Sequence, residues 1–547
     1  MHISKIHIEN FKIFKGSFKL PLSNGMNILV GDNEAGKSTI IEAIHLALSG
    51  LFNGKYLKNE LTQYLFNKEI VAEYIQSLEE GNSAAVLPHI LIEVFMEGDD
   101  LAEFLGDASS EKAATGFFLK IAFDERFQPQ YEKLVKLGGI KTLPIEYYNI
   151  TWSSFARDES ITPRTIPLKS ALIDSASSRF QNGSDIYISH IVKEFLELDE
   201  IVEVSQAHRR MKESFMDEPS IIKINEKIKS AAKISEKKVE LSVELSSKNA
   251  WESSLMTYLE DIPFHFIGKG EQSIVKTKLA LGHKKAKEAN VILMEEPENH
   301  LSHSKLNQLI SDIKSGSSDK QIIISTHSSF VANKLGLENL IFINDLKRTC
   351  LNYLSGETQK FFKKLSGYDT LRLILCKKAI LVEGDSDELV IQKAFQINNQ
   401  GKLPIEKGVD VISVGTSFLR FLEIAEKLNK NVVVVTDNDG DVEAVKKKYD
   451  KYLGDNKKET IEICFDEVVD TGVIEDFNYN TLEPKVLKEN GLEKLNKIFG
   501  TSHKGVNSMH LFMRANKTEC ALRIFDTSEE ISFPKYILDA IKPDVPK

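Results

Sequence analysis

Apolar and polar residues alternate along the first part of the chain, and a period of two predicts β-strands. The apolar run at 26–30 is uninterrupted and ends at Gly31, which is typical of a buried strand followed by a tight turn. A helix is expected from Lys37 to about Ser49. The expected strands cover residues 3–8, 11–20, 26–30 and 89–96.

The pattern changes between about residues 151 and 249. Long charged stretches there carry apolar residues at helical spacing, as in IIKINEKIKSAAKISEKKVELSVELSSK, which begins at Ile221. We expect a helical insert over residues 156–250 that serves dimerisation. A solvated helical arm without a partner has the same periodicity and stays open as the alternative.

Short apolar runs return after Trp251. VILM, QIIIS and NLIFIN are bounded by polar residues and helical stretches, the pattern of buried parallel strands. A second block of this kind starts near Cys376 with AILVE, VDVISV and NVVVVTDND. The sequence therefore predicts an α/β fold in four segments. The first α/β unit consists of two parts, residues 1–155 and 251–370, and the helical insert at 156–250 separates them. The second α/β unit follows at 371–547.

The composition is that of a globular protein with several domains. The 547 residues are 42% hydrophobic and 27% charged with 14 prolines, which excludes collagen-like and mainly disordered chains. A formal net charge of -10 argues against coating nucleic acid by bulk basicity but leaves room for local basic grooves. Four widely spaced cysteines indicate neither a disulfide framework nor a zinc ribbon. Since no apolar run resembles a signal peptide or a membrane span, we expect a cytoplasmic protein.

The segment GDNEAGKS, which begins at Gly31, matches the pattern G-x-x-x-x-G-K-[ST] between a predicted strand and a predicted helix. The glycines let the backbone curl so that amide hydrogens face phosphates, and Lys37 would neutralise the phosphates. The Ser38 hydroxyl would bind magnesium. The residues expected to bind ATP are Gly31, Asn33, Gly36, Lys37, Ser38 and Thr39.

Two adjacent acids follow the apolar strand at 291–294. Glu295 would hold magnesium through water, and Glu296 would polarise the water that attacks ATP. His327 ends the next strand and would sense the γ-phosphate. Plain surface charge at a strand end is the alternative for the two acids, and the presence of His327 reduces its weight.

This arrangement resembles the ABC-type ATPase heads of the structural-maintenance-of-chromosomes kind. The resemblance implies that two heads clamp ATP between them, and that a signature loop from one copy covers the nucleotide held by the other. The matching segment here would be GKGEQS at 268–273, a degenerate form of the usual signature. The insert is too short for a long coiled coil and suits a compact dimerisation unit. The Q-loop glutamine stays open between Gln63 and Gln76.

Acidic residues also end two strands of the second block. Glu383 and Asp387 follow the first of these strands, and Asp437 and Asp439 follow a later one. Because the carboxyl ends of parallel strands converge on one crevice, these carboxylates are expected to bind one or two magnesium ions. Such ions would activate water against a phosphodiester.

Other carboxylate motifs fit these residues less well. An EF-hand would need glycine at the sixth loop position and a closing glutamate, whereas the glycine stands at 440 and Lys448 takes the closing place. A haloacid-dehalogenase phosphatase would use the D-x-D pattern but would leave Glu383 and Asp387 without a role. Solvated acids at strand ends remain the plain alternative for either cluster alone.

The two acid clusters resemble a Toprim domain, whose pattern is a strand-end glutamate followed by glycine, and then D-x-D after a second strand. An ABC-type head followed by such a domain is the architecture of the OLD (overcoming lysogenization defect) family of nucleases. That family includes the ATPase–nuclease subunit of the Gabija antiphage system. The resemblance covers nearly the whole chain and extends to Ser413-Val414-Gly415 at the end of the intervening strand.

The resemblance implies roles for individual residues. Three acids would surround one metal ion: Glu383, Asp387 and Glu475. Asp437 and Asp439 would bind the second metal ion. Lys517 would lie near the scissile phosphate, and an ordinary surface lysine is its alternative.

The resemblance to this family implies an ATP-regulated endonuclease or nickase that uses Mg²⁺ or Mn²⁺, cuts double-stranded DNA and serves antiphage defence. It would act as a homodimer or higher homo-oligomer, alone, with a helicase, or with a reverse transcriptase and its RNA, and without a membrane. Lysine runs would follow DNA phosphates at 363–364, 377–378 and 446–448. A non-cutting DNA repair ATPase and a Toprim topoisomerase or primase stay open as alternatives.

Overall fold

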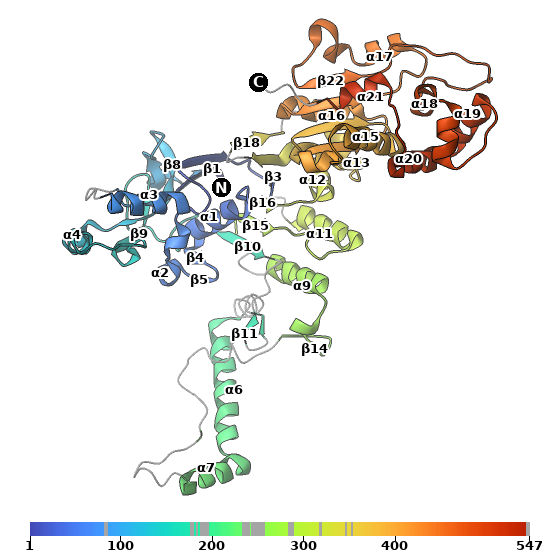
Figure 1. The fold of residues 1–547 in the computed structure, drawn as a ribbon. Coiled ribbons are helices and arrows are strands. Elements are labelled where there is room, and N and C mark those ends of the chain that lie inside the picture. Colours follow the sequence, from blue (N-terminus) through green and yellow to red (C-terminus); the bar gives the residue numbers. More distant parts are fainter. Residues whose placement is uncertain are drawn as a thin grey trace. The chain divides into compact units, whose positions relative to one another are not determined.

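The structure is a computed structural model that forms two compact units, Met1–Thr326 and His327–Lys547 (Figure 1). The residues it describes are 1–80, 86–174, 180–181, 184–185, 196–231, 241, 257–282, 289–316, 320–344, 347–351 and 354–542. The four-segment division stays a prediction. None of the helices within these ranges is both long and apolar enough to cross a membrane.

An antiparallel sheet opens the first unit. Its strand order is β2-β1-β6-β8-β7, and β9 also pairs with β8. The strands are β1 His2–Glu9, β2 Ser17–Pro21, β6 Ile90–Glu97, β7 Leu105–Gly106, β8 Ala114–Phe123 and β9 Tyr148–Ser154. The strand expected at 11–20 is shorter than predicted, because the chain turns before Ser17 and Phe11 forms only an isolated bridge with Phe66.

A parallel sheet forms the second layer of this unit, in the order β10-β15-β16-β3. Its strands are β3 Met26–Gly31, β10 Ser170–Asp174, β15 Val291–Glu295 and β16 Gln321–Ser325. Helix α1 (Lys37–Ser49) contacts strands of both sheets. Most of its residues are buried, Ile40, Ile41 and Ile44 completely, as expected for a helix enclosed on several sides.

One strand of the parallel sheet lies within the range predicted for the helical insert. β10 lies inside it and pairs with β15, because its short run SALID fits a strand in the parallel sheet. The helices described in this region are α6 (Leu198–Met216), which begins at a capping box between Glu197 and Glu200, and α7 (Pro219–Ala231). Residues 232–240 and 242–250 of the predicted insert lie outside the described residues.

The other longer helices of the first unit are α3 Lys68–Glu79, α4 Gln128–Leu137, α9 Lys269–Gly282 and α11 His303–Gly316.

The second unit contains a four-stranded parallel sheet in the order β20-β19-β21-β22. Its strands are β19 Lys378–Val382, β20 Val409–Ser413, β21 Asn431–Val435 and β22 Ile461–Cys464. The chain runs from β19 outward to β20 and then returns to β21 on the other side of β19. Strand order therefore reverses between β19 and β21, where ligands of open α/β sheets usually bind, at the carboxyl ends of the strands.

Helices cover both faces of this sheet, since β19 and β21 are buried at nearly every consecutive position. The helices are α14 Thr370–Leu375, α15 Asp385–Asn398, α16 Phe418–Leu428, α18 Leu482–Phe499, α19 Val506–Ala515, α20 Lys517–Asp526 and α21 Lys535–Ala540 (Figure 1). Helix α18 is broken at Gly491, whose φ of 73° lies in the left-handed region. Side chains from α15, α18, α19, α20 and α21 share one hydrophobic core with the sheet.

A hairpin and two helices precede this sheet in the second unit: α12 Ser329–Leu335, β17 Leu340–Asn344, β18 Lys347–Cys350 and α13 Gly356–Lys364.

One buried lysine holds the loop after β22 in place through ion pairs and a hydrogen bond. Lys485 of α18 is 3% exposed, and its Nζ lies 2.6 Å from Asp466 Oδ2 and 2.8 Å from Asp470 Oδ2. The same Nζ donates a hydrogen bond to the Val468 carbonyl oxygen at 2.8 Å. A buried charge of this kind is stable only while its partners remain.

Replacing Lys485 with methionine should therefore destabilise the second unit. Two carboxylates would lose their buried counter-charge, and we expect a cost of about 3 kcal/mol in the free energy of unfolding. Urea unfolding followed by circular dichroism measures it. Lys488→Met is the matched control, because Lys488 also contacts Asp470 but from the surface, and it should change stability by less than about 1 kcal/mol. Equal effects of the two changes would contradict the assigned role of Lys485.

Candidate functional site

The loop between β3 and α1 has the backbone of a phosphate-binding site. Gly36 caps α1 with a φ of 98°, in the left-handed region, and a Cβ at this position would lie 2.7 Å from Ile13 Cδ1. Only glycine satisfies both constraints. Behind it, Ser38 is exposed and Thr39 is buried in the first turn of the helix. The Ser38 hydroxyl is thus accessible to a metal ion, and the free amides of the first turn are available to phosphate oxygens.

Lys37 is buried at the start of α1, and its Nζ donates hydrogen bonds to the Gly31 and Asp32 carbonyl oxygens, both at 2.9 Å. Burial lowers the pKa of Lys37, and the negative charges of Glu296, Asp32 and Glu298 partly oppose this shift. A phosphate anion would offer a stronger partner than two carbonyl groups. The residues that would hold ATP are the six predicted from the sequence: Gly31, Asn33, Gly36, Lys37, Ser38 and Thr39.

The predicted acids follow β15 in the same unit. Glu295 is level with Ser325 of β16, and the Glu296 amide donates to the Ser325 carbonyl oxygen at 3.0 Å. The Glu296 carboxylate accepts from Asn299 Nδ2 at 2.8 Å. The charge of Glu296 raises the pKa of Lys37 against the effect of burial, so Glu296 and the phosphate loop lie at the same edge of the sheet. His327 begins the second unit, and its role as a phosphate sensor stays a prediction.

Sequence reasoning missed Glu298 at this edge. Its Oε1 accepts a hydrogen bond from Thr326 Oγ1 at 2.7 Å, which joins the loop after β15 to the end of β16. Glu298 is the third acid of the segment Glu-Glu-Pro-Glu, so the sequence did show a candidate carboxylate there. The sequence does not show which of these acids contacts the neighbouring strand.

The candidate signature segment forms the start of α9. A Cβ on Gly270 would lie 2.4 Å from the His300 carbonyl oxygen, so close packing requires glycine there. Gln272 is buried and donates to the carbonyl oxygens of Phe264 and Ile267 at 2.9 and 2.8 Å. Gly268 and Lys269 are exposed. The glutamine thus anchors the segment, while its exposed beginning is available to a second molecule.

Both candidate Q-loop glutamines make local contacts. Gln63 accepts from the Leu143 amide at 3.1 Å, and Gln76 donates to Glu80 at 2.8 Å. Neither contact singles out the Q-loop residue.

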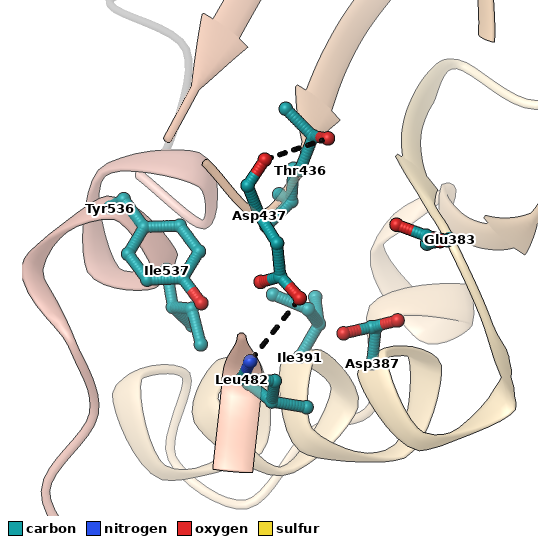
Figure 2. A pocket seen from close by; sticks show the side chains of 9 residues that line it. Glu383, Asp387, Ile391, Thr436, Asp437, Leu482, Tyr536 and Ile537 are labelled. Atoms are coloured by element: carbon teal, nitrogen blue, oxygen red, sulfur yellow. Dashed lines mark hydrogen bonds between the residues drawn. The ribbon is translucent and has the colours of Figure 1, made fainter. Parts of the chain in front are cut away.

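In the second unit, a small cavity opens at the carboxyl ends of β19 and β21. Figure 2 shows the carboxylates of Glu383, Asp387 and Asp437 turned toward this shared space, with the ring of Tyr536 on another side. Glu383 directly follows β19, Asp387 lies in the first turn of α15, and Asp437 follows β21. The reversal of strand order therefore brings together three of the acids predicted from distant parts of the sequence.

Backbone hydrogen bonds orient two of these acids. Asp387 Oδ2 accepts from the Gly384 amide at 2.9 Å, which caps α15. Asp437 Oδ2 accepts from the Leu482 amide at 3.3 Å, at the start of α18 (Figure 2). Both aspartates are thus held by helix amino termini, where a negative charge is favoured.

The Ser413-Val414-Gly415 segment supports the third acid from the neighbouring strand. The Gly415 amide donates to the Glu383 carbonyl oxygen at 3.0 Å, and the Ser413 hydroxyl donates to the same oxygen at 3.3 Å. Gly415 has a φ of 57°, which favours glycine. These contacts fix the backbone of Glu383 at the rim of the cavity.

Burial and the charges of neighbouring acids raise the pKa values of Asp387 and Asp437. The pKa of Asp387 rises to about 6, chiefly by burial and further by the charges of Glu483 and Glu383, while the Gly384 amide and Lys517 act in the opposite direction. The pKa of Asp437 rises well above its usual value by burial and by the charges of Asp387, Glu483 and Asp439. The unfavourable energy of these carboxylates would be relieved by a cation.

The structure brings some predicted residues to this cavity and leaves others outside it. Asp439 is exposed, has a φ of 48°, and accepts from Asn478 Nδ2 at 2.8 Å. Glu475 is exposed on the loop after β22 and does not line the cavity. Lys517 is half-exposed at the start of α20, with its Nζ 3.4 Å from Glu483 Oε2. The metal-binding roles of Asp439 and Glu475 therefore stay predictions.

Two residues at the site were missed by sequence reasoning. Glu483 is 6% exposed, and its charge acts on both cavity aspartates. Tyr536 lines the cavity, and burial raises its pKa further above the ordinary value. An acid inside a helix and a tyrosine near the carboxyl terminus carry no motif, so only tertiary packing identifies them.

The donor set fits a hard divalent cation. Carboxylate oxygens are the ligands preferred by Mg²⁺, and water would complete its shell. Among the residues that the structure describes, no group of three or more Asp, Glu, His or Cys side chains is close enough to hold a metal ion as it stands. Glu383, Asp387 and Asp437 are the residues that would hold the ion.

Comparison with known proteins finds limited similarity to DNA repair proteins. The DNA replication and repair protein RecF of Xanthomonas axonopodis pv. citri (strain 306) is 33% identical over 87 residues. RecF of Xanthomonas euvesicatoria pv. vesicatoria (strain 85-10) is 34% identical over 86 residues. Each match covers 16% of this chain and 22% of the relative.

Solved structures with a similar chain course are distant. The recombination mediator protein RecF with ATP has a TM-score of 0.33 and 12% identity, with 64% of this chain and 99% of that chain covered. The Smc head bound to the C-winged helix domain of ScpA has a TM-score of 0.32 and 16% identity, with the same coverage of 64% and 99%.

Family models match both parts of the chain. An AAA ATPase domain matches residues 1–332, and the TOPRIM domain of overcoming-lysogenization-defect-like proteins matches residues 374–439. The first match spans more than half of the chain. The chain thus carries an AAA ATPase domain with a P-loop, followed by a Toprim domain, and the two domains imply use of a nucleotide and a divalent metal ion. The chain belongs to the AAA ATPase domain family and, with its Toprim domain, matches the OLD family of ATPase–Toprim nucleases.

Proposed function

We propose that this protein is an ATP-regulated DNA endonuclease or nickase that uses Mg²⁺ or Mn²⁺. One observation carries the proposal. Three carboxylates from separate segments, Glu383, Asp387 and Asp437, face a common cavity at the point where the Toprim sheet reverses its strand order. Such a cluster of partly desolvated acids suits metal-assisted attack on a phosphodiester.

The residues at the cavity would have different roles in cutting. A divalent ion, when bound, would supply an activated water and stabilise the leaving oxygen. Glu383, Asp387 and Asp437 would hold it, and Asp439 and Glu475 would approach to complete a second position when DNA is bound. A phosphodiester brings negative charge to an acidic cavity. Lys517, beside Glu483, would offset part of that charge.

The ATPase head would control access to this cavity. Lys37 and Ser38 would bind the phosphates and their magnesium ion, while Glu295 and Glu296 would support hydrolysis. The exposed residues Gly268 and Lys269, where α9 begins, would cover the nucleotide of a second copy. ATP would then close or open a homodimer, with His327 reporting the γ-phosphate, and so decide whether duplex DNA reaches the acids.

We also propose a role in bacterial antiphage defence, which the resemblance to the OLD family supports. The protein would act in the cytoplasm, alone, with a helicase, or with a reverse transcriptase and its RNA.

The second candidate is a DNA repair ATPase that does not cut. The stretch similar to RecF favours it, because that relative is a replication and repair protein by name. A plasmid incubated with and without Mn²⁺ separates the two functions, since only a nuclease converts supercoiled DNA to nicked or linear forms.

The two sites should be separable by substitution. Glu383→Ala removes a cavity carboxylate and should lower plasmid nicking by about 10³-fold, while ATP hydrolysis changes less than about twofold. Lys37→Ala should abolish ATP binding, measured with a fluorescent nucleotide, and leave the acids in place. Glu406→Ala changes an exposed acid that does not line the cavity, and it is the control. Full nicking activity in the Glu383 variant would refute the site assignment.

The metal-free protein should lose stability as pH rises. The pKa of Asp387 is about 6 in the folded protein and near its ordinary 3.8 when unfolded, so the folded state binds the proton more tightly. The stability that protonation provides is complete below about pH 4 and is lost as pH rises through about 6. Thermal melting in EDTA at pH 5 and pH 7.5 measures this loss.

Added Mg²⁺ should raise the melting temperature at pH 7.5 more than at pH 5, because protons compete for the same carboxylates. Asp387→Asn keeps an acceptor for the Gly384 amide but cannot ionise. It should show a smaller difference between the two pH values in EDTA. An unchanged difference would show that another group is responsible.

A further inference from the structure

The first turn of α18 links the carboxylate cavity to Lys517. The Leu482 amide donates to Asp437 Oδ2 at 3.3 Å, and the next residue, Glu483, lies 3.4 Å from Lys517 Nζ. One helical turn therefore touches a cavity acid with its backbone and the lysine with its side chain.

Glu483 is well placed to hold an ammonium group. It is 6% exposed, it lies at a helix amino terminus where a carboxylate is favoured, and its Oε2 also accepts from Thr481 Oγ1 at 3.2 Å. Its side chain is thus fixed by packing and by a second hydrogen bond. Helices α18 and α20 also contact each other, which holds the backbones of both partners.

Lys517 needs such a partner. Its side chain is 49% exposed, and a free lysine samples many rotamers whose restriction costs entropy. Within the described part of the chain, Glu483 is the carboxylate that forms an ion pair with it. The pair also acts on the cavity, because Glu483 raises and Lys517 lowers the pKa of Asp387.

We propose that Glu483 is a positioning residue that holds the Lys517 ammonium at the edge of the carboxylate cavity, ready to contact the phosphate that is cut. The inference deepens the proposed nuclease function and rests on it. In this proposal Glu483 acts through Lys517 and not as a ligand of the metal ion, a distinction that the Mn²⁺ midpoint tests.

A double-mutant cycle on the full chain tests this role. Plasmid nicking is measured with Mn²⁺ for wild type, Glu483→Gln, Lys517→Ala and the double variant. Glutamine keeps the shape of the side chain and removes its charge. We expect kcat to fall about tenfold for Glu483→Gln, with KM and the Mn²⁺ midpoint changed less than about twofold, because a misplaced group costs rate more than affinity. The double variant should match Lys517→Ala, since coupled residues are not additive.

The controls separate positioning from other roles. Glu489→Gln changes an exposed acid of the same helix and should nick like wild type. Glu483→Asp keeps the charge and should recover part of the lost rate. Wild-type nicking by Glu483→Gln, a further loss in the double variant, or a shifted Mn²⁺ midpoint would each overturn the proposal.

A second measurement does not depend on cutting. Acetylation of Lys517 by an N-hydroxysuccinimide ester, followed by mass spectrometry, should be several-fold faster in Glu483→Gln than in wild type, because the ion pair protects the amine. An unchanged rate would overturn the proposal. If the rate rises but wild type cuts no DNA under any metal, the proposed function fails while the ion pair stands.

Discussion

Burial of carboxylates at the ends of two neighbouring parallel strands, together with repulsion among them, sets the electrostatics of the cavity in the second unit. The strand order β20-β19-β21-β22 reverses between β19 and β21, and this reversal places Glu383 and Asp437 at one crevice. Like charges in a partly desolvated space raise one another's pKa, as Asp387 and Asp437 show. Helix amino termini at α15 and α18 offset part of this cost through backbone amides. The remainder of the cost is what a bound cation would relieve.

In the first unit the buried charge is positive and the expected ligand is an anion. Its loop after β3 is built to receive an anion, with Lys37 buried beneath a glycine-capped helix start. Burial lowers the pKa of the lysine, and the charges of Glu296, Asp32 and Glu298 partly oppose this shift. Each unit thus contains charged side chains that a ligand of opposite charge would stabilise. Binding of ATP should therefore stabilise the first unit, and binding of a metal ion should stabilise the second. Neither effect requires coupling between the two sites.

The candidate sites were predictable to different degrees. The phosphate loop is contiguous, so its residues follow from one motif and a strand–helix context. Glu383, Asp387 and Asp437 were predictable because strand ends of parallel sheets converge. Glu483 was not, since a carboxylate in a helix has no distinguishing pattern, and its importance comes from contact with Lys517 across two helices. The short strand β10 within the predicted insert was not expected, because it can be recognised only through its pairing with β15.

The sequence by itself determined the α/β character, the ATP loop, and the two acidic strand ends, because each depends on residues near one another along the chain. The tertiary structure decided which acids share a cavity. Glu483 of α18 and Tyr536 of α21 lie at the site, whereas Glu475 is exposed on a loop outside the cavity. The reason is physical. A motif specifies local backbone and chemistry, but desolvation and charge interaction depend on distances between side chains, and only the packing of helices on the sheet sets those distances.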